Sequence, residues 1–365
     1  MSLAERVKPH IASLEPYQPG KPIEVLEREL GIPNAAKLAS NENPLGPSPK
    51  AVKAIQQAAQ GMHRYPDGAS YQLRNALAER LEVSPAQLVF GSGSSEVLEL
   101  LAKAFISPGD EVVFAWPSFS MYPIVTQGMG GTPVQVPLDA DLVHDLPAMT
   151  DAVTERTRVV IVCNPNNPTG TSVGAAAFDR FVESLPDDVV LVVDEAYVEY
   201  ARRADLPDAL GWVARRPGTL VTRTFSKLYG LAGVRVGYGI ADPELAGYLE
   251  RARHPFNLNL LAGAAALAAL DDIEHVEATR RANAEGGEQL TQGLEALGFR
   301  VWPTDANFLL AELGEDAYDK LLHQGVIVRP MGGFGLVGCV RISIGTAEEN
   351  EKLIKAVETW RGSKA

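Results

Sequence analysis

The amino-acid sequence is poor in cysteine, and it has no apolar run long enough to cross a membrane. Its two cysteines, Cys163 and Cys339, lie inside the apolar runs VVIVC and CVRISI, which indicates small buried side chains rather than a redox pair. The longest apolar runs fall well short of the roughly 20 residues that a transmembrane helix needs. The opening MSLAERVKPH lacks the apolar segment of a signal peptide. We therefore expect a cytoplasmic protein without a membrane partner.

The sequence also lacks an excess of basic charge and any cluster of metal ligands. Its 33 basic and 46 acidic residues give a net charge of −13, which disfavours nucleic acid as a partner because phosphate backbones attract positive surfaces. A local arginine pocket can still bind an anionic substrate. The six histidines are scattered, and none stands in an HExxH motif or a His/Cys cluster. We therefore expect no metal site.

The order of apolar segments predicts an α/β protein of more than one domain. A chain of 365 residues exceeds one ordinary domain. Residues 1–48 are rich in proline and turn formers, which indicates an extended arm. From Pro49 onward, helical spacing alternates with short β-branched runs that suit strands buried on both faces, as in a parallel sheet. These strands are expected in segments 87–90, 110–115, 132–137, 158–163, 188–194, 219–225 and 234–241.

Helices are expected between these strands, and a second set of strands follows them. Helical spacing is found in segments 51–60, 71–81, 95–105, 174–185 and 242–253, and the segment from 258 to 292 indicates further helices. Strands of a smaller α+β domain are expected at 299–304, 307–313, 326–331 and 339–345. We assign residues 1–48 to the arm and part of the small domain, 49–255 to a large domain, and 256–365 to the small domain.

Open α/β sheets bind ligands at the carboxyl ends of their strands, so the polar residues there are the candidates for a site. The run GSGSSE at 91–96 follows one strand and opens a helix, where free N–H groups favour a phosphate. Glu96 occupies the third glycine position of a dinucleotide fingerprint, which argues against a nicotinamide dehydrogenase. A literal GxGxxG at 333–338 leads into a strand instead of a helix, so we expect a flexible loop there.

Three later strands end in side chains that have both a structural and a chemical interpretation. Phe119 is either a core aromatic or a platform that stacks on a flat ring. Asn167, in NPNNPTG, is either part of an ordinary Asn-Pro turn or a hydrogen-bond donor to a ligand. Asp194 ends a fully apolar strand and needs a partner, which is either an arginine or a protonated ring nitrogen.

Lys227 follows the strand at 219–225 and stands in the run TFSKLYGLAGVRVGYG, with Arg235 eight residues later. Most lysines are solvated surface charges. A lysine at the end of a buried strand can instead have a lowered pKa and act as an amine nucleophile.

The ordered set of motifs resembles the fold-type-I pyridoxal-phosphate aminotransferases along nearly the whole chain. The set consists of the Gly-rich loop, the aromatic residue, NPNNPTG, DEAY, TFSK and GVRVGY. The resemblance implies a large domain with a mostly parallel seven-stranded sheet, a small α+β domain, and pyridoxal 5′-phosphate as the cofactor. It also implies an enzyme that moves an amino group between an amino donor and a 2-oxo acid.

The same resemblance implies a role for each matching residue. Lys227 corresponds to the lysine that binds the cofactor covalently and shuttles a proton, and Asp194 to the partner of the pyridine nitrogen. Tyr197 and Asn167 correspond to donors to the ring oxygen, and Phe119 to the residue that stacks on the ring. Further cofactor contacts are implied for Ser94, Ser95, Glu96, Thr224, Ser226 and Arg235, and all of these except Glu96 belong to a phosphate cup.

Motifs near the N-terminus resemble those of the histidinol-phosphate aminotransferase group. These motifs are PYQPGKP, LASNENPLGPSP and RYPD. The resemblance implies that Tyr17 closes over the substrate and that Tyr65 reaches the cofactor phosphate of a neighbouring subunit, as in an obligate homodimer. Without the other motifs, packing under a proline-rich loop would be the favoured explanation for either tyrosine.

Arg329 and Arg341 stand in or beside strands of the small domain and suit bidentate binding of carboxylate or phosphate. In the resembling group, these positions hold the substrate anion. The implied reaction transfers the amino group of glutamate to imidazole-acetol phosphate and gives histidinol phosphate, in histidine biosynthesis.

Three other functions remain open. An aromatic amino acid aminotransferase of the same subgroup would share nearly every motif. A phosphothreonine-type decarboxylase on the same scaffold would release carbon dioxide. A silent binding or regulatory protein is disfavoured because Lys227, Asp194 and Arg235 are all present.

Overall fold

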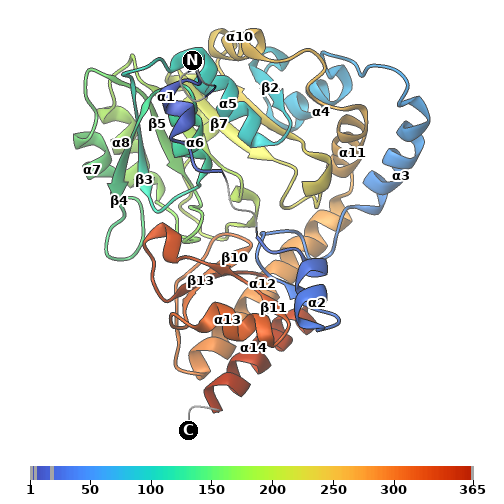
Figure 1. Ribbon diagram of the computed structural model, residues 1–365. Helices are drawn as coiled ribbons and strands as arrows, with labels where there is room; N and C mark the ends of the chain where they lie inside the picture. Colours follow the sequence, from blue (N-terminus) through green and yellow to red (C-terminus); the bar gives the residue numbers. More distant parts are fainter. Residues whose placement is uncertain (1–2, 4–5, 17–19, 363–365) are drawn as a thin grey trace.

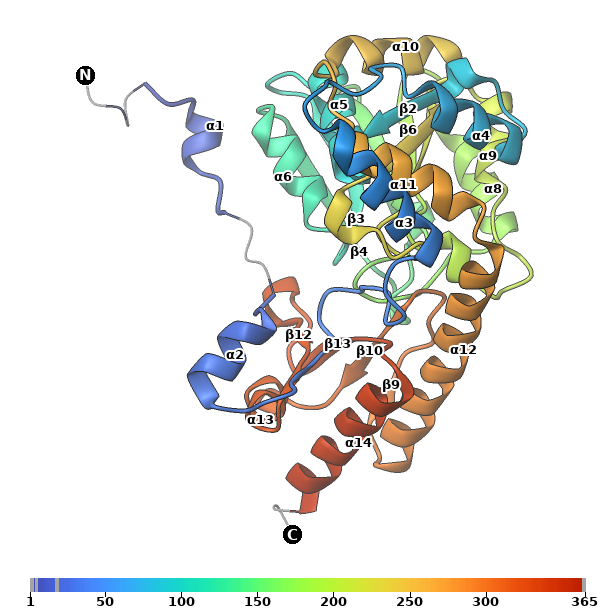
Figure 2. The ribbon, with the colours of Figure 1, turned by 90° about the vertical axis from the view of Figure 1, so that its right-hand side faces the viewer.

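The structure is a computed structural model that describes residues 3, 6–16 and 20–362. Figure 1 shows two parts, with a large sheet and its helices above and a smaller group of strands and helices below. The chain passes from the small part to the large part just before residue 49, and it returns along one long helix (Figures 1 and 2). The site described below lies where these two parts meet.

The large part is built on a seven-stranded sheet with the order β2-β8-β7-β6-β5-β3-β4. Neighbouring strands are parallel, except that β8 runs antiparallel to both β2 and β7. The strands are β2 (Leu88–Gly91), β3 (Glu111–Trp116), β4 (Thr132–Pro137), β5 (Thr157–Cys163), β6 (Val190–Asp194), β7 (Thr219–Thr224) and β8 (Gly237–Ala241).

Both faces of this sheet are buried, as the continuous β-branched runs predict. In β5, Val160 and Val162 pack into one hydrophobic core, while Val159 and Ile161 pack into the core on the opposite face. This alternation follows from the two-residue period of a strand. One face is covered by α3 (Pro49–Ala58), α4 (Tyr71–Leu81), α7 (Leu146–Asp151), α8 (Ala175–Ser184), α9 (Ala209–Arg215) and α11 (Leu260–Leu270). The other face is covered by α5 (Ser94–Phe105), α6 (Met121–Gly128) and α10 (Pro243–Ala252).

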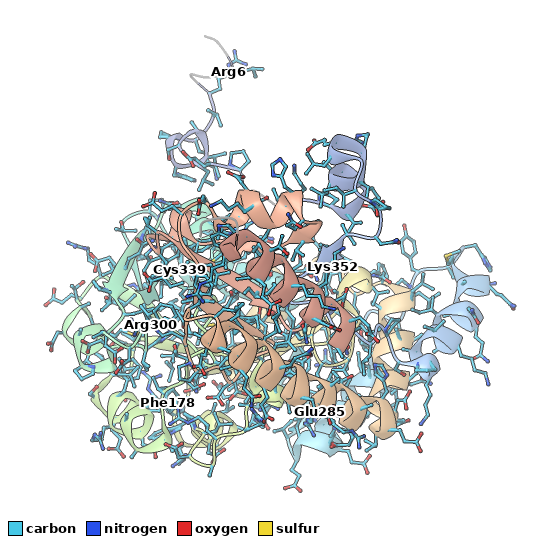
Figure 3. All side chains as sticks on the ribbon, turned by 90° about the horizontal axis from the view of Figure 1, so that it is seen from below. Arg6, Phe178, Glu285, Arg300, Cys339 and Lys352 are labelled. Atoms are coloured by element: carbon cyan, nitrogen blue, oxygen red, sulfur yellow. The ribbon has the colours of Figure 1, made fainter. Side chains whose placement is uncertain are left out.

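The small part contains a four-stranded antiparallel sheet of order β12-β13-β10-β9, and a pair of short parallel strands, β1 and β11. The strands are β1 (Ala36–Lys37), β9 (Arg300–Val301), β10 (Phe308–Glu312), β11 (Val326–Ile327), β12 (Arg329–Pro330) and β13 (Cys339–Ser343). Its helices are α2 (Ile23–Leu30), α12 (Ile273–Ala296), α13 (Ala317–His323) and α14 (Ala347–Gly362). Figure 3 shows α12 and α14 side by side across the lower face of this part.

The N-terminal segment serves both parts of the molecule. A short helix, α1 (Pro9–Ala12), lies against α6 of the large part, and Figures 2 and 3 show it projecting from the body together with Arg6. Helix α2 and strand β1 belong to the small part, where Leu26 and Ala39 pack against Ile327.

The division into domains stays a proposal, and the packing moves its second boundary. Residues 256–365 were expected in the small domain, yet α11 packs against α3 and contributes to the core beside the large sheet. The reason is that α11 is almost wholly apolar and α3 offers it a matching face. We propose that the large domain extends through α11 and that α12 leads into the small domain (Figure 2).

The predicted fold class is confirmed, because the sheet is mostly parallel and has seven strands, each within or close to an expected segment. The GFGLVG segment forms a single 3₁₀ turn, Gly332–Phe334, before it enters β13. In the part of the chain that the structure describes, no helix is long and apolar enough to cross a membrane.

Candidate active site

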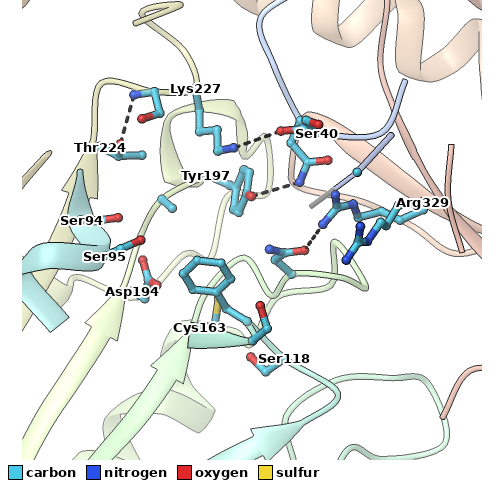
Figure 4. A pocket seen from close by; sticks show the side chains of 18 of the residues that line it. Ser40, Ser94, Ser95, Ser118, Cys163, Asp194, Tyr197, Thr224, Lys227 and Arg329 are labelled. Carbon is cyan, nitrogen blue, oxygen red and sulfur yellow. Dashed lines mark hydrogen bonds between the residues drawn. The ribbon is translucent and has the colours of Figure 1, made fainter. Parts of the chain in front are cut away.

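A pocket lies between the two parts, at the carboxyl ends of the large sheet's strands (Figure 4). Segments that follow β2, β3, β5, β6 and β7 each send residues into it, and β12 and β13 of the small part close its other side. The sequence-predicted residues that line it are Ser94, Ser95, Phe119, Asn167, Asp194, Tyr197, Thr224, Ser226, Lys227, Arg235, Arg329 and Arg341. The fold therefore gathers at one place residues that are spread over most of the chain.

Lys227 lies three residues beyond the end of β7, and its half-buried side chain enters the pocket. Its Nζ lies 3.4 Å from the carbonyl oxygen of Ser40 and 5.5 Å from the centre of the Tyr197 ring. Burial and, next, the positive charge of Arg341 lower the pKa of Lys227 from 10.5 to about 7. Near neutral pH, the Lys227 side chain is therefore a neutral, nucleophilic amine in a substantial share of the molecules.

Asp194 is the last residue of β6, and its side chain is buried. The Tyr122 hydroxyl donates to Oδ2 at 2.8 Å, and the Thr222 hydroxyl donates to Oδ1 at 3.1 Å. Burial raises the pKa of Asp194, and these two donors oppose that rise. The expected arginine partner is found instead at the next residue, where Arg223 pairs with Glu195 at 2.7 Å.

The start of α5 and the turn before β8 form a cluster of potential phosphate donors. Ser94 and Ser95 occupy the first helical turn, where backbone N–H groups have no partner within the helix. The Arg235 guanidinium lies across this turn and donates to the Ser226 hydroxyl at 3.2 Å. Cations and free N–H groups thus converge on one end of the pocket.

Glycine is required at two positions of this cluster. Gly93 has a φ of +85°, and a Cβ there would collide with the Arg235 guanidinium. A Cβ at Gly237 would collide with the backbone nitrogen of Ser94. The two glycines therefore let β8 and the Arg235 side chain approach the start of α5 closely.

The opposite end of the pocket carries the two predicted arginines of the small part. Arg341 donates to Asn167 Oδ1 at 2.6 Å and to the Ala39 carbonyl at 2.7 Å. Arg329 also lines the pocket, and Figure 4 shows it on the small-part side. Tyr197 is buried between the two ends.

Two of the predicted site residues, Glu96 and Tyr65, do not line this pocket. The Glu96 carboxylate accepts from the backbone N–H of Ser92 and from Asn257 at 2.9 Å, so its side chain braces the Gly-rich loop. The prediction that Glu96 contacts a cofactor stays a prediction, which its side chain does not support. Tyr65 is 83% exposed and stacks on Phe256 with 4.8 Å between ring centres, outside this chain's own pocket. Tyr17 lies outside the described residues.

Sequence reasoning did not identify several residues at the site. Tyr122 and Thr222 hold Asp194, yet an apolar helix and an apolar strand carry them, so no local pattern marks them. Ser40 and Asn41 come from the small part and line the pocket. The SNEN run contributes to the family resemblance, and its tertiary contacts give it a physical role.

The described residues fit a flat, anionic, carbonyl-bearing cofactor. The amine of Lys227, the buried carboxylate of Asp194 and the donor cluster around Arg235 all face one pocket. Phe119 adds an aromatic ring to the lining of the same pocket. Among the described residues, no group of three or more His, Cys, Asp or Glu side chains is arranged to hold a metal ion.

The chain belongs to the aminotransferase class I and II family, whose family model matches residues 33–357. It is 49% identical to histidinol-phosphate aminotransferase 2 of Methylococcus capsulatus, over 98% of this chain and 99% of that protein. It is 50% identical to histidinol-phosphate aminotransferase of Moorella thermoacetica, over 95% of this chain and 91% of that protein. The motif-based resemblance is confirmed by these matches.

A solved structure agrees with the sequence comparisons. Histidinol-phosphate aminotransferase from Sinorhizobium meliloti, in complex with pyridoxal 5′-phosphate, superposes with a TM-score of 0.90 at 32% identity. The match covers 99% of this chain and 98% of that one. Family membership makes this chain an aminotransferase.

Proposed function

We propose that this aminotransferase uses pyridoxal 5′-phosphate to exchange an amino group between histidinol phosphate and 2-oxoglutarate, in histidine biosynthesis. One observation carries the proposal: a low-pKa lysine and a buried carboxylate share a pocket with two arginines at its other end. The names of the relatives, at 49% and 50% identity, support the choice of substrate.

The two arginines suit both half-reactions. Histidinol phosphate and glutamate each carry an anion some distance from the reacting amine, a phosphate in one case and a carboxylate in the other. Guanidinium groups bind both anions through paired N–H donors. We propose that Arg329 and Arg341 receive either anion, so that one pocket serves two substrates.

The cofactor, when bound, supplies a carbonyl that amines can attack and a ring that accepts electrons from the substrate's α-carbon. We propose that the Lys227 amine would bind the cofactor covalently at this carbonyl between turnovers. During turnover, the same amine would remove and return the proton of the substrate's α-carbon. Asp194 would keep the ring nitrogen protonated, because a buried carboxylate strongly favours a facing cation. Asn167 and Tyr197 would bind the ring oxygen, and Phe119 would stack on the ring face.

The phosphate of the cofactor is assigned to the donor cluster at the start of α5. We propose Ser94, Ser95, Thr224, Ser226 and Arg235 as its ligands. The Glu96 carboxylate is left out, because it is bonded to the loop and would repel a phosphate.

A homodimer with shared active sites is part of the proposal. The exposed ring of Tyr65, which does not line this chain's own pocket, supports a role in a neighbouring one. Tyr17 is proposed to close over the substrate. A cytoplasmic location stays a prediction.

The test follows the visible absorption of the cofactor-loaded protein while single amino donors are added. We expect histidinol phosphate to convert the cofactor to its amino form at far lower concentration than phenylalanine or tyrosine. Added 2-oxoglutarate should then restore the original spectrum and yield glutamate. Equal or better conversion by the aromatic amino acids would assign the chain to the aromatic subgroup. Release of carbon dioxide would indicate the decarboxylase, and failure to take up the cofactor would refute the proposal.

A further inference from the structure

Three consecutive residues of the N-terminal segment contact three different functional groups in the pocket. The Ala39 carbonyl accepts from Arg341 at 2.7 Å, and the Ser40 carbonyl accepts from Lys227 at 3.4 Å. The side-chain amide of Asn41 donates to the Tyr197 hydroxyl at 3.0 Å. In this segment, Asn41 makes its contact through a side chain, whereas Ala39 and Ser40 use backbone carbonyls. The chemistry of the Asn41 contact therefore depends on the residue type.

Asn41 is held in one orientation by its surroundings. It is 1% exposed and has a φ of +54°, in the left-handed region that asparagine tolerates better than most residues. Its backbone N–H donates to the Ser343 hydroxyl at 2.7 Å, and its carbonyl accepts from Asn307 at 3.0 Å. The Ser343 hydroxyl in turn donates to Asn41 Oδ1 at 3.1 Å. Because Oδ1 is thereby occupied as an acceptor, the NH₂ group is the one that faces Tyr197.

This orientation restricts what the Tyr197 hydroxyl can do. Its oxygen accepts a hydrogen bond from Asn41, so its own proton must be donated to another group. Burial raises the pKa of Tyr197 to about 12, while Arg341 and the Asn41 hydrogen bond act against the rise. The hydroxyl therefore keeps its proton at neutral pH. Tyr197 lines the pocket, where Lys227, Asp194, Arg341 and Cys163 are the charged or titratable groups around it.

We propose that Asn41 is a positioning residue that directs the Tyr197 proton toward the ring oxygen of the bound cofactor. This inference rests on the proposed function, because it assumes that the cofactor lies in this pocket. A donated proton partly neutralises the ring oxygen. That oxygen then attracts less strongly the proton it shares with the Lys227 nitrogen, so the bound cofactor loses this proton at lower pH.

Two substitutions test the side-chain donor of Asn41 while they keep its backbone conformation. Asn41→Gly keeps the left-handed backbone conformation accessible and deletes the amide. Asn41→Asp keeps the size and the conformation, but it replaces the donor with an acceptor that would take the Tyr197 proton. The first measurement is the pH midpoint of the cofactor's visible absorption. The second is the dissociation constant of the cofactor from the apoprotein.

We expect the Asn41→Gly midpoint to rise by about 0.5 to 1 unit, the roughly threefold to tenfold effect of one hydrogen bond. We expect a larger rise for Asn41→Asp and weaker cofactor binding in both variants. In a Tyr197→Phe background, Asn41→Gly should cause no further rise, because the proton it directs is already absent. A full rise in that background, or none in the wild-type background, would overturn the inference.

A matched control shows whether loss of any left-handed asparagine has the same effect. Asn34 has a φ of 56° and is exposed, and its backbone N–H and carbonyl bond to Glu27 and Lys352. Asn34→Gly should leave both the midpoint and the cofactor's dissociation constant unchanged. The proposed function fails separately, when the wild-type protein binds no cofactor or ignores histidinol phosphate. The Asn41 inference fails when the wild-type protein binds the cofactor and reacts with histidinol phosphate, but the variants show no shift in the pH midpoint.

Discussion

At the scale of single residues, the site depends on how burial shifts the pKa values of Lys227 and Asp194. Lys227 and Asp194 both lose solvent at the end of apolar strands, and burial disfavours the charged form of each. For Lys227 the loss produces a reactive amine. For Asp194 it produces a carboxylate that favours a cation as its partner, which a protonated ring nitrogen would provide.

The first prediction concerns Lys227→Ala. We expect the variant to keep its fold and any dimer, because the half-buried side chain makes one long hydrogen bond, at 3.4 Å. Turnover should fall on the order of 10⁴-fold or more, because the proton-transfer group is lost. Circular dichroism and size-exclusion chromatography check the fold, and steady-state assays check the rate. Near-normal turnover would mean that another residue moves the proton.

The second prediction concerns the pH dependence of cofactor capture by the apoprotein. The pKa of Lys227 is lowered to about 7 from 10.5, and only the neutral amine attacks a carbonyl. The capture rate at saturating cofactor should therefore rise as the pH increases through about 7 and level off above it. Stopped-flow absorbance measures the rate. A rate that keeps rising toward pH 10 would show that the lysine is not perturbed.

At the scale of elements, the contact between α5 and β8 forms the phosphate end of the pocket. The helix start supplies free N–H groups, and the strand lies close enough to support it only because Gly237 has no side chain. The Glu96 carboxylate holds the preceding loop from the other side.

The third prediction compares two glycine substitutions. In Gly237→Ala, the new methyl group would collide with the Ser94 backbone nitrogen, so the start of α5 must shift. We expect cofactor binding to weaken by about tenfold or more, with loss of stability typical of a steric clash in a core. Gly247→Ala is the control, because it lies inside α10 with no atom near its Cβ position. That variant should bind normally and be more stable by up to about 1 kcal/mol. Calorimetry of cofactor binding and thermal melts check both.

The sequence predicted the strands that are buried on both faces well, and it predicted the helices that are buried on only one face less well. All seven strands of the large sheet lie within or close to their expected segments, since strands buried on both faces leave continuous apolar runs. The helices that were not predicted are α1, α2, α6, α7, α9, α13 and α14. All of them except α14 span at most eight residues and carry few turns of apolar spacing. Helices were expected in the segment that contains α11, but the place of α11 beside α3 depends on packing that no local pattern records.

At the scale of the whole molecule, the pocket exists because two parts of the chain meet. The large sheet supplies Lys227 and Asp194, and the small part supplies Arg329, Arg341 and the segment at 39–41. The proposed dimer would add Tyr65 from a neighbouring subunit, since this ring is exposed and does not line its own chain's pocket.

The fourth prediction tests that sharing by mixing two variants. Lys227→Ala and Tyr65→Ala should each be impaired alone, because each lacks one group at every site. If Tyr65 serves the neighbouring subunit, a mixed dimer contains one site with both defects and one intact site. Equal mixing with subunit exchange should then restore about a quarter of wild-type activity, since half of the dimers are mixed and each has one good site. A mixture that shows only the mean of the two variants would place Tyr65 in its own subunit's site.

The sequence by itself determined the α/β fold class, the order of the strands along the chain and the candidate residues at the strand ends, whose roles come from the family resemblance and stay proposals. It did so because apolar periodicity and polar residues at strand ends are local properties of the chain. Tertiary structure alone decided that Tyr122 and Thr222 hold Asp194, that Glu96 braces a loop, and that Asn41 faces Tyr197. These pairs are separated by up to 161 residues, and hydrogen bonds over such distances depend on how helices and sheets pack rather than on neighbouring residues.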